Sequence, residues 1–306
     1  MIDTVKLAYV VPTKDRPDDL AKLLDSINQQ TRMPVQIVVV DGSEPAIKHV
    51  TDKYPQLPIT YVREVPPSLT RQRNAGMAAL HDDVTIAGYL DDDIVLEDDA
   101  TEQMISFWES AGPDIGGAAF TIVNQFAPHH ESILRIFAIE SRTPGVVLSS
   151  GFAAAIPCVP TTIETDWLYG GATMWRRNVI DTITYDEWYE GYGYLEDLDY
   201  SYRVKQNWRL FVLAEAKAWH YPRNIAIDKQ YEFGRQQVFN RFYFIRKMGL
   251  FSPITFSWAL IGVFMMNFLA LLRHFDPPRI RRLKGNFRGL FAAIAGRRET
   301  FPGHWK

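Results

Sequence analysis

Three consecutive aspartates directly follow an apolar segment of the chain. The segment VTIAGYL, residues 84–90, has the length and composition of a buried strand, and Asp91, Asp92 and Asp93 come next. Mg²⁺ and Mn²⁺ usually bind one or two carboxylates together with the phosphates of a substrate. A solvated acidic turn has the same composition. The position directly after a buried strand favours the divalent cation and a phosphorylated ligand.

A second acidic cluster opens a predicted helix over residues 195–206, within GYGYLEDLDYSYRVKQ. Glu196, Asp197 and Asp199 there complement the helix dipole, so capping is one interpretation. The other is a general base, because a carboxylate held against aromatic side chains gains proton affinity and can take a hydroxyl proton. The aromatic residues around the cluster could also stack on a sugar ring. These residues alone favour neither interpretation.

Two weaker candidates lie elsewhere. In RQRNAG, residues 71–76, Arg71 and Arg73 suit phosphate oxygens, although a solvated helix face is an equal interpretation. His220 follows a short predicted strand, where a packed histidine is the usual case and an Mn²⁺ ligand the alternative. The sequence has no GxGxxG after a strand, no GxxxxGK[ST] and no zinc-type spacing of Cys and His.

The elements that position these residues alternate along the first third of the chain. Apolar, β-branched runs predict strands, and apolar residues at helical spacing predict helices. The predicted strands are 6–11, 35–40, 59–64 and 84–90, and the predicted helices are 16–30, 45–54 and 69–81. This rhythm indicates a parallel sheet covered on both faces, with ligands at the carboxyl ends of its strands. The Gly- and Pro-rich segment 113–175 predicts short strands and loops; a strand over 209–213 and a helix over 228–248 follow.

The composition is that of a packed globular protein. Of 306 residues, 47% are hydrophobic and 23% charged, and the net charge is −3. The single cysteine, Cys158, excludes a disulfide framework within the chain and suits a reducing cytoplasm. The N-terminal apolar run is short, so we expect no signal peptide.

The C-terminal part combines an apolar segment with basic residues. Residues 254–272 carry no charge, and their length is close to the ~20 residues that span a bilayer. From Arg273 to Lys306 the chain has nine Lys or Arg and two acidic residues. If the domain that precedes this segment lies in the cytoplasm, a single crossing would place the basic flank outside the cytoplasm. That orientation is against the positive-inside tendency. We therefore expect helices that lie in the membrane interface on anionic headgroups; packing on the preceding domain or on a second subunit is the alternative.

Taken together, these motifs resemble the family-2 glycosyltransferases, which have the GT-A fold. The resemblance covers roughly residues 5 to 222. The matching segments, in order, are VVPTKDRPDDLAKLLDSINQQ, VVVDGS, RQRNAG, YLDDDI, WLYGGATMWRR, GYLEDLDYSYRV and His220. The resemblance implies an α/β, Rossmann-like and mostly parallel central sheet flanked by helices, with a C-terminal helical appendage. It also implies inverting transfer of a sugar from a nucleotide-activated donor, with bound Mg²⁺ or Mn²⁺.

The resemblance also assigns roles to residues. Asp197 matches the catalytic base, and Glu196 would orient the acceptor or the base. Asp93, Asp91 and His220 would ligate the metal. The expected nucleotide and donor residues are Pro12, Thr13, Arg16, Asp41, Arg73, Asn74, Asp91, Asp92, Gly170 and Gly171. Many members have two aspartates before the Gly-Ser of the loop after the second strand, and here Val40 takes the place of the first aspartate. The expected contact to the base of the nucleotide therefore departs from the family pattern.

From this resemblance we expect a catalytic domain over residues 1–225, with a nucleotide-binding half at about 1–120 and an acceptor half at about 121–225. Residues 226–306 are then the membrane-associated helices. The expected protein is peripheral on the cytoplasmic face of the inner or plasma membrane, acts in cell-surface polysaccharide synthesis and binds no nucleic acid. It uses a glycan or polyprenyl-linked acceptor, and a homodimer is a further expectation.

Two other functions are consistent with the same motifs. A polyprenyl-phosphate sugar synthase would use a phosphate acceptor, which needs no base, so the Glu196–Asp197 pair argues against it. A non-catalytic nucleotide- or glycan-binding relative is the other, and the presence of Asp93 and Asp197 argues against that one.

Overall fold

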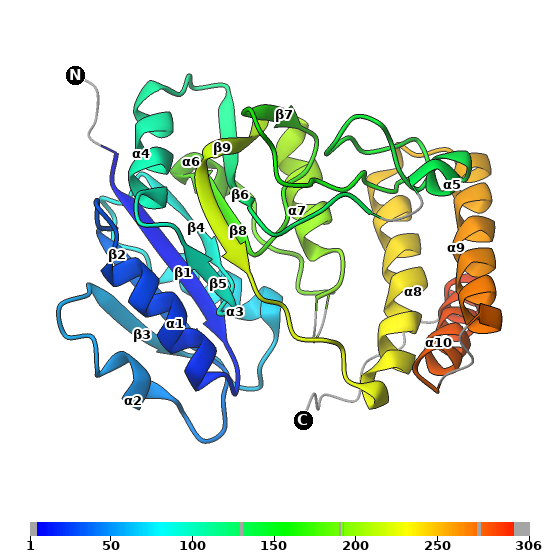
Figure 1. Ribbon diagram of the computed structural model, residues 1–306, viewed down its shortest axis with the longest axis horizontal. Coiled ribbons are helices and arrows are strands. Elements are labelled where there is room, and N and C mark those ends of the chain that lie inside the picture. Colours follow the sequence, from blue (N-terminus) through cyan, green and yellow to red (C-terminus); the bar gives the residue numbers. More distant parts are fainter. Residues whose placement is uncertain (1–4, 129–130, 190, 192, 274–276, 297–306) are drawn as a thin grey trace. The chain divides into compact units, whose positions relative to one another are not determined.

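The structure, a computed structural model, describes residues 5–128, 131–189, 191, 193–273 and 277–296 (Figure 1). The chain forms two compact units. Of the described residues, the first unit holds those up to Phe126 together with Ile156–Pro222, and the second holds those of 127–155 together with those from Arg223 to 296.

The first unit is built on one sheet whose amino-terminal half is parallel. Its strand order begins β3-β2-β1-β4, and every neighbouring pair in this part is parallel. The strands are β1 Leu7–Thr13, β2 Gln36–Asp41, β3 Ile59–Arg63 and β4 Ile86–Leu90. Thr13 pairs with Asp41, and Asp41 pairs with Arg63. The carboxyl ends of these strands therefore lie at one edge, as the sequence predicts.

Beyond β4 the sheet is mixed, in the order β8-β6-β9-β5, with β7 also on β9. The strands are β5 Ile94–Leu96, β6 Ile115–Ile122, β7 Ile163–Thr165, β8 Ala172–Arg176 and β9 Arg209–His220. β8 runs antiparallel to β4 and β6, and β5 runs antiparallel to β9. Because Ile94 pairs with His220, the histidine lies beside the end of the aspartate run.

Helices cover both faces of this sheet, which explains the continuous apolar strands. The helices of the first unit are α1 Pro17–Asn28, α2 Lys48–Thr51, α3 Leu69–Ala78, α4 Ala100–Ser110, α6 Arg177–Thr182 and α7 Glu196–Lys205. Val11 and Val39 belong to the core shared with α1 and α4, while Val10 and Val38 belong to the core shared with α6 and α7. Both faces of a strand are buried, as in parallel sheets generally.

The second unit is helical. It contains α5 Glu131–Ile136, the 3₁₀ turn η1 Ile227–Lys229, and the long helices α8 Gln230–Met248, α9 Pro253–Arg273 and α10 Pro277–Ile294. Glycines allow α8 and α10 to pack closely, since a Cβ on Gly285 would lie 2.0 Å from the carbonyl oxygen of Tyr231. Asn286 of α10 donates a 2.8 Å hydrogen bond to the carbonyl of Gly234.

The predicted α/β fold with a C-terminal helical appendage is confirmed. Two elements differ in length from the prediction. The expected helix at 45–54 is reduced to α2, and the expected strand at 209–213 extends to His220 as β9. The extension was missed because exposed Glu215 and Lys217 alternate with buried alanines, which weakens the apolar signal. Residues 127–155, which we expected in the acceptor half, group with the C-terminal helices.

Candidate active site

The side chain of Gln72 joins the ends of the first two strands to α3. Its amide nitrogen donates to the carbonyl of Thr13 at 2.9 Å and to that of Val40 at 2.8 Å. Gln72 is buried, so these bonds form in a low-dielectric interior where unpaired carbonyls would be costly.

Pro12, an expected nucleotide contact, is itself buried within β1.

Asp92 holds the acidic loop against the loop that follows β1. Thr13 Oγ1 donates to Asp92 Oδ2, and Arg16 Nη1 donates to Asp92 Oδ1, both at 2.8 Å. Arg16 Nη1 also lies 3.1 Å from Asp93 Oδ2. Burial raises the pKa of Asp92 to about 7, although Arg16 and Thr13 oppose this shift. The two carboxylates are thus brought together by one guanidinium, and Asp92 acts as the anchor of the loop.

Asp93 and His220 form the pair best suited to a metal. His220 Nε2 lies 3.2 Å from Asp93 Oδ1, a buried oxygen that has no other polar partner among the described residues. Burial raises the pKa of Asp93 and lowers that of His220, but their mutual attraction outweighs both effects, so the pKa of Asp93 is lowered and that of His220 is raised. Two adjacent octahedral ligands of Mg²⁺, each about 2.1 Å from the ion, are roughly 3 Å apart. The pair therefore fits two neighbouring ligand positions.

The third expected ligand does not join this pair. Among the described residues, no group of three His, Cys, Asp or Glu side chains is close enough to hold a metal. Asp91 instead pairs with Arg73, at 3.2 Å between Oδ1 and Nη2. The remaining ligands of an ion at Asp93 and His220 would therefore come from substrate phosphates and water, which is usual for Mg²⁺.

Arg73 lies at the centre of the candidate site rather than on its surface. Its side chain is 1% exposed. Nη1 donates to Glu196 Oε1 at 2.6 Å, and the guanidinium lies 5.2 and 5.1 Å from the rings of Tyr89 and Tyr185. We expected this arginine beside the nucleotide, whereas it connects the aspartate run to the second acidic cluster.

The second acidic cluster lies at the amino terminus of α7, after a turn with unusual backbone angles. Leu195, the residue before the helix, has φ 77°, and Gly193 has φ 73°. A leucine in this left-handed region is strained, and such strain is common at functional sites. The turn delivers Glu196, which is buried, and Asp197, which is half-buried. Asp197 therefore retains access to solvent.

Asp197 is held by backbone donors. Oδ1 accepts from the amide of Leu198 at 2.7 Å, and Oδ2 accepts from the amide of Gly170 at 3.2 Å. Burial raises the pKa of Asp197, while Arg73 and the two amides lower it; the net shift is upward. Burial likewise raises the pKa of Glu196. A carboxylate with raised proton affinity and solvent access has the properties of a general base.

The two expected donor-site glycines are needed for contacts within the protein. A Cβ on Gly170 would lie 2.6 Å from Arg73 Nη1, and a Cβ on Gly171 would lie 2.7 Å from Asp91 Oδ2. The backbone of the pair therefore packs directly against the Arg73–Asp91 ion pair. Close approach of a donor sugar, for which we expected these glycines, stays a prediction.

Two other expected nucleotide contacts are engaged inside the fold. Asp41 is 0% exposed and accepts from the amides of Ser43 and Ile47, at 2.7 and 2.8 Å, from Arg63 at 2.7 Å, and from the hydroxyl of Tyr61. The side chain of Asn74 pairs with the backbone of Tyr185 in both directions, at 3.0 and 2.9 Å. Both residues thus support loops at the sheet edge.

Sequence reasoning missed three residues that organise this edge, namely Arg63, Gln72 and Tyr185. Arg63 ends β3 and lies one residue before the end of the predicted strand, at the edge where ligands were expected, so its position was a usable signal. Gln72 lies within the RQRNAG segment, but its role depends on which face of α3 is buried. Tyr185 comes from an irregular segment, and only the fold brings it to Arg73.

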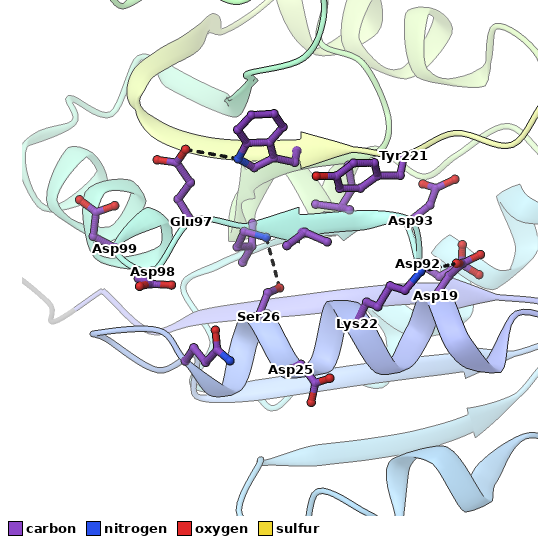
Figure 2. Close-up of a pocket in the computed structure, with 15 residues that line it drawn as sticks. Asp19, Lys22, Asp25, Ser26, Asp92, Asp93, Glu97, Asp98, Asp99 and Tyr221 are labelled. Carbon is purple, nitrogen blue, oxygen red and sulfur yellow. Dashed lines mark hydrogen bonds and ion pairs between the residues drawn. The ribbon is translucent and has the colours of Figure 1, made fainter.

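A pocket of about 890 Å³ adjoins the aspartates on the side of α1 (Figure 2). Asp92 and Asp93 lie at one end of it with Tyr221, and Glu97, Asp98 and Asp99 lie at the other. Asp19, Lys22 and Asp25 of α1 line its side. Carboxylates predominate, so the pocket disfavours a diphosphate that is not accompanied by a cation.

Residues 9–146 match the profile of the family described as glycosyl transferase family 2. This match covers somewhat less than half of the 306 residues. A relative in Bacillus subtilis strain 168, "Uncharacterized glycosyltransferase YwdF", is 35% identical to this chain over 74 residues, which are 24% of this chain and 28% of that relative.

Solved glycosyltransferase structures share the fold of this chain. The mannosyltransferase PcManGT from Pyrobaculum calidifontis, in complex with GDP-Man and Mn²⁺, has a TM-score of 0.53 and 15% identity, over 97% of this chain and 77% of that one. Residues 1–349 of TarS from S. aureus have a TM-score of 0.51 and 16% identity, over 96% of this chain and 92% of that one. The fold is therefore that of the GT-A glycosyltransferases.

The buried ion pair of Asp41 predicts a pH-dependent contribution to stability. Burial raises the pKa of Asp41, but its hydrogen bonds from Ser43, Tyr61 and Ile47 outweigh burial, so the folded-state pKa is lowered. The stabilisation is then present above the unfolded-state pKa of about 4 and lost as the pH falls through the lower folded-state value.

We expect Asp41→Asn to lower the free energy of unfolding at pH 7 by about 2 kcal/mol or more, because buried partners lose a charged acceptor. The difference from wild type should shrink below about pH 4. Urea unfolding at several pH values measures this. Asp52→Asn, at an exposed pair with Lys48, is the control and should change little. An Asp41→Asn deficit that is constant with pH would contradict the assignment.

Proposed function

We propose that this protein is an inverting glycosyltransferase that moves a sugar from a nucleotide-sugar donor to a hydroxyl of a glycan or lipid-linked acceptor in cell-surface polysaccharide synthesis. The single observation that carries the proposal is the linked acidic site of a family-2 domain. Asp93 and His220 lie on one side of the Asp91–Arg73–Glu196 connection, and Asp197 follows on the other. PcManGT, which shares the fold, binds GDP-Man and Mn²⁺.

In this proposal, Asp197 accepts the proton of the acceptor hydroxyl. The amides of Gly170 and Leu198 hold its two oxygens, and burial gives it the proton affinity that a base requires. Asp93 and His220 would hold Mg²⁺ or Mn²⁺, which neutralises charge on a departing diphosphate. One base and one attack from the opposite face of the sugar invert the anomeric centre.

The position of Asp197 also favours a hydroxyl acceptor over a phosphate. A polyprenyl-phosphate sugar synthase would need no base, since its acceptor is already an anion. The strained turn at Leu195 and the two amides that fix Asp197 would then have no catalytic purpose.

We further propose that the helical unit binds the cytoplasmic face of a membrane. Among the described residues, α9 is the one helix long and apolar enough to cross a bilayer. Its exposed side carries the stripe Ile254, Trp258, Ile261, Phe268 and Leu272, at helical spacing. Its other side packs within the second unit, where Phe256, Ala259, Leu260 and Gly262 are buried and Gly262 lies against Phe137. Trp258, at the border of the stripe, donates to the carbonyl of Ile136 at 2.8 Å. A helix packed along one side is suited to the interface.

Basic residues lie on α10, which contacts α9 within the second unit. Arg281, Lys284 and Arg288 are exposed on α10, as are Phe287 and Phe291. Basic residues next to apolar ones favour anionic lipid headgroups. A second copy of the chain is the other occupant that the stripe could take.

The function predicts that Asp197→Asn abolishes transfer without abolishing nucleotide binding. The amide cannot accept the proton, so kcat should fall about 10²- to 10⁴-fold. Product formation across a panel of nucleotide sugars measures transfer, and calorimetry measures nucleotide binding. Asp181→Asn, at an exposed pair with Arg177, is the control. Wild-type turnover in Asp197→Asn would refute the base assignment.

The metal site predicts that Mn²⁺ affinity depends on Asp93 and His220. Asp93→Asn should weaken Mn²⁺-dependent nucleotide binding by about tenfold or more. Only the neutral imidazole binds metal, and Asp93 raises the pKa of His220, so affinity should rise with pH and level off above that pKa. Calorimetry at several pH values should show this rise in wild type and a flatter profile in His220→Gln. Asp98→Asn, from the far end of the pocket, is the control; an equal loss there would indicate non-specific attraction.

The membrane proposal predicts that Ile261→Ser/Phe268→Ser loses vesicle binding. The full chain should sediment with vesicles of phosphatidylglycerol and phosphatidylcholine, and the double variant should sediment several-fold less because it loses buried apolar area. Met33→Ser/Val35→Ser, at exposed apolar residues of the first unit, is the control. A wild-type dimer that ignores vesicles and becomes monomeric in the stripe variant would assign the stripe to a subunit interface instead.

A further inference from the structure

Arg73 connects two acidic clusters that are far apart in the sequence. It lies on α3, between the carboxylate of Asp91 after β4 and that of Glu196 at the start of α7. The separation along the chain is 18 residues to Asp91 and 123 residues to Glu196. With its side chain 1% exposed, Arg73 is closed off from direct contact with substrate.

The surroundings of Arg73 leave its guanidinium little freedom. The rings of Tyr89 and Tyr185 lie 5.2 and 5.1 Å from it, and the backbone of Gly170 leaves no room for a side chain. The same Gly170 donates its amide to Asp197. A movement of Arg73 would therefore be transmitted both to Glu196 and to the amide that orients Asp197.

We propose that Arg73 is a positioning residue, which fixes Asp197 for proton abstraction by holding Glu196 and Gly170 and which supplies the positive charge that balances the acids around it. The proposal rests on the function proposed above for Asp197. It assigns Arg73 to the base rather than to the nucleotide.

Charge sets the direction of the effect. The charged and titratable groups around Asp197 are Arg73 of α3, Asp91 after β4, Glu196 of α7 and Tyr185 before α7. Arg73 lowers the pKa of Asp197, whereas Asp91 raises it, and Glu196 and Asp197 repel each other. Removing Arg73 and removing the charge of Glu196 should therefore act in opposite directions.

The experiment compares the acid limb of the pH profile of kcat among variants. In Arg73→Met the limb should move to higher pH by about one unit or more, because a nearby opposite charge shifts a carboxylate by 1–3 units. In Glu196→Gln it should move to lower pH. In Arg73→Met/Glu196→Gln, which removes both charges of the buried pair, it should return toward the wild-type position.

Two further variants separate charge from geometry. Arg73→Lys keeps the charge, but an ammonium lacks the planar, forked donors with which the guanidinium bridges two carboxylates. We therefore expect kcat to fall about tenfold or more, while the acid limb stays within roughly 0.3 pH units of its wild-type position. Arg32→Met removes a surface arginine paired with Glu109 and should match wild type in both respects. If Arg73→Met does not fold, Glu196→Gln and the double variant still test the sign of each shift.

Carboxyl NMR titration of Asp197 in the protein without substrate provides a readout that does not need activity. The same opposite shifts are expected there. The proposal would be overturned if the pKa of Asp197 were unchanged in the variants. It would also be overturned if Arg73→Met and Glu196→Gln shifted that pKa in the same direction. Absence of transfer in wild type with the expected NMR shifts would instead refute the proposed function and leave the role of Arg73 in place.

Discussion

Two buried or partly buried guanidiniums make this site possible, because five carboxylates converge at one edge of a sheet. Arg16 pairs with Asp92 and Asp93, and Arg73 pairs with Asp91 and Glu196. Carboxylates taken out of water are strongly disfavoured unless they are paired and hydrogen-bonded. Arg16 follows β1, and Arg73 lies on α3, which follows β3. The strand order β3-β2-β1-β4 therefore places the two charges among the acids that follow β4.

The rest of the edge protects these pairs. Gln72 ties the ends of β1 and β2, Asp41 gathers the loop after β2, and the Gly170–Gly171 backbone packs on Arg73 and Asp91. Asp197 differs from the other acids because backbone amides, rather than a guanidinium, hold its oxygens. It is also half-buried rather than buried. This difference is the physical reason for proposing Asp197, and not the other acids, as the base.

The helical second unit has a different surface chemistry from the first unit. Its α9 helix exposes an uncharged apolar stripe, and α10 exposes basic residues. The membrane proposal rests on these two properties. An enzyme that uses a lipid-linked acceptor would benefit from such a surface, and the two proposals support each other without depending on each other.

The sequence by itself determined the strand-helix rhythm of the first third, the helix α7, the apolar helix α9 and the acidic, arginine and glycine residues of the site. Periodicity and local composition carry that information because they depend on neighbours along the chain. The sequence did not determine that Arg73 turns inward to Glu196, that Asp41 is fully buried, or that Asp91 stands apart from Asp93 and His220. Only the tertiary structure decided those pairings, because burial and long-range strand order select which charge meets which.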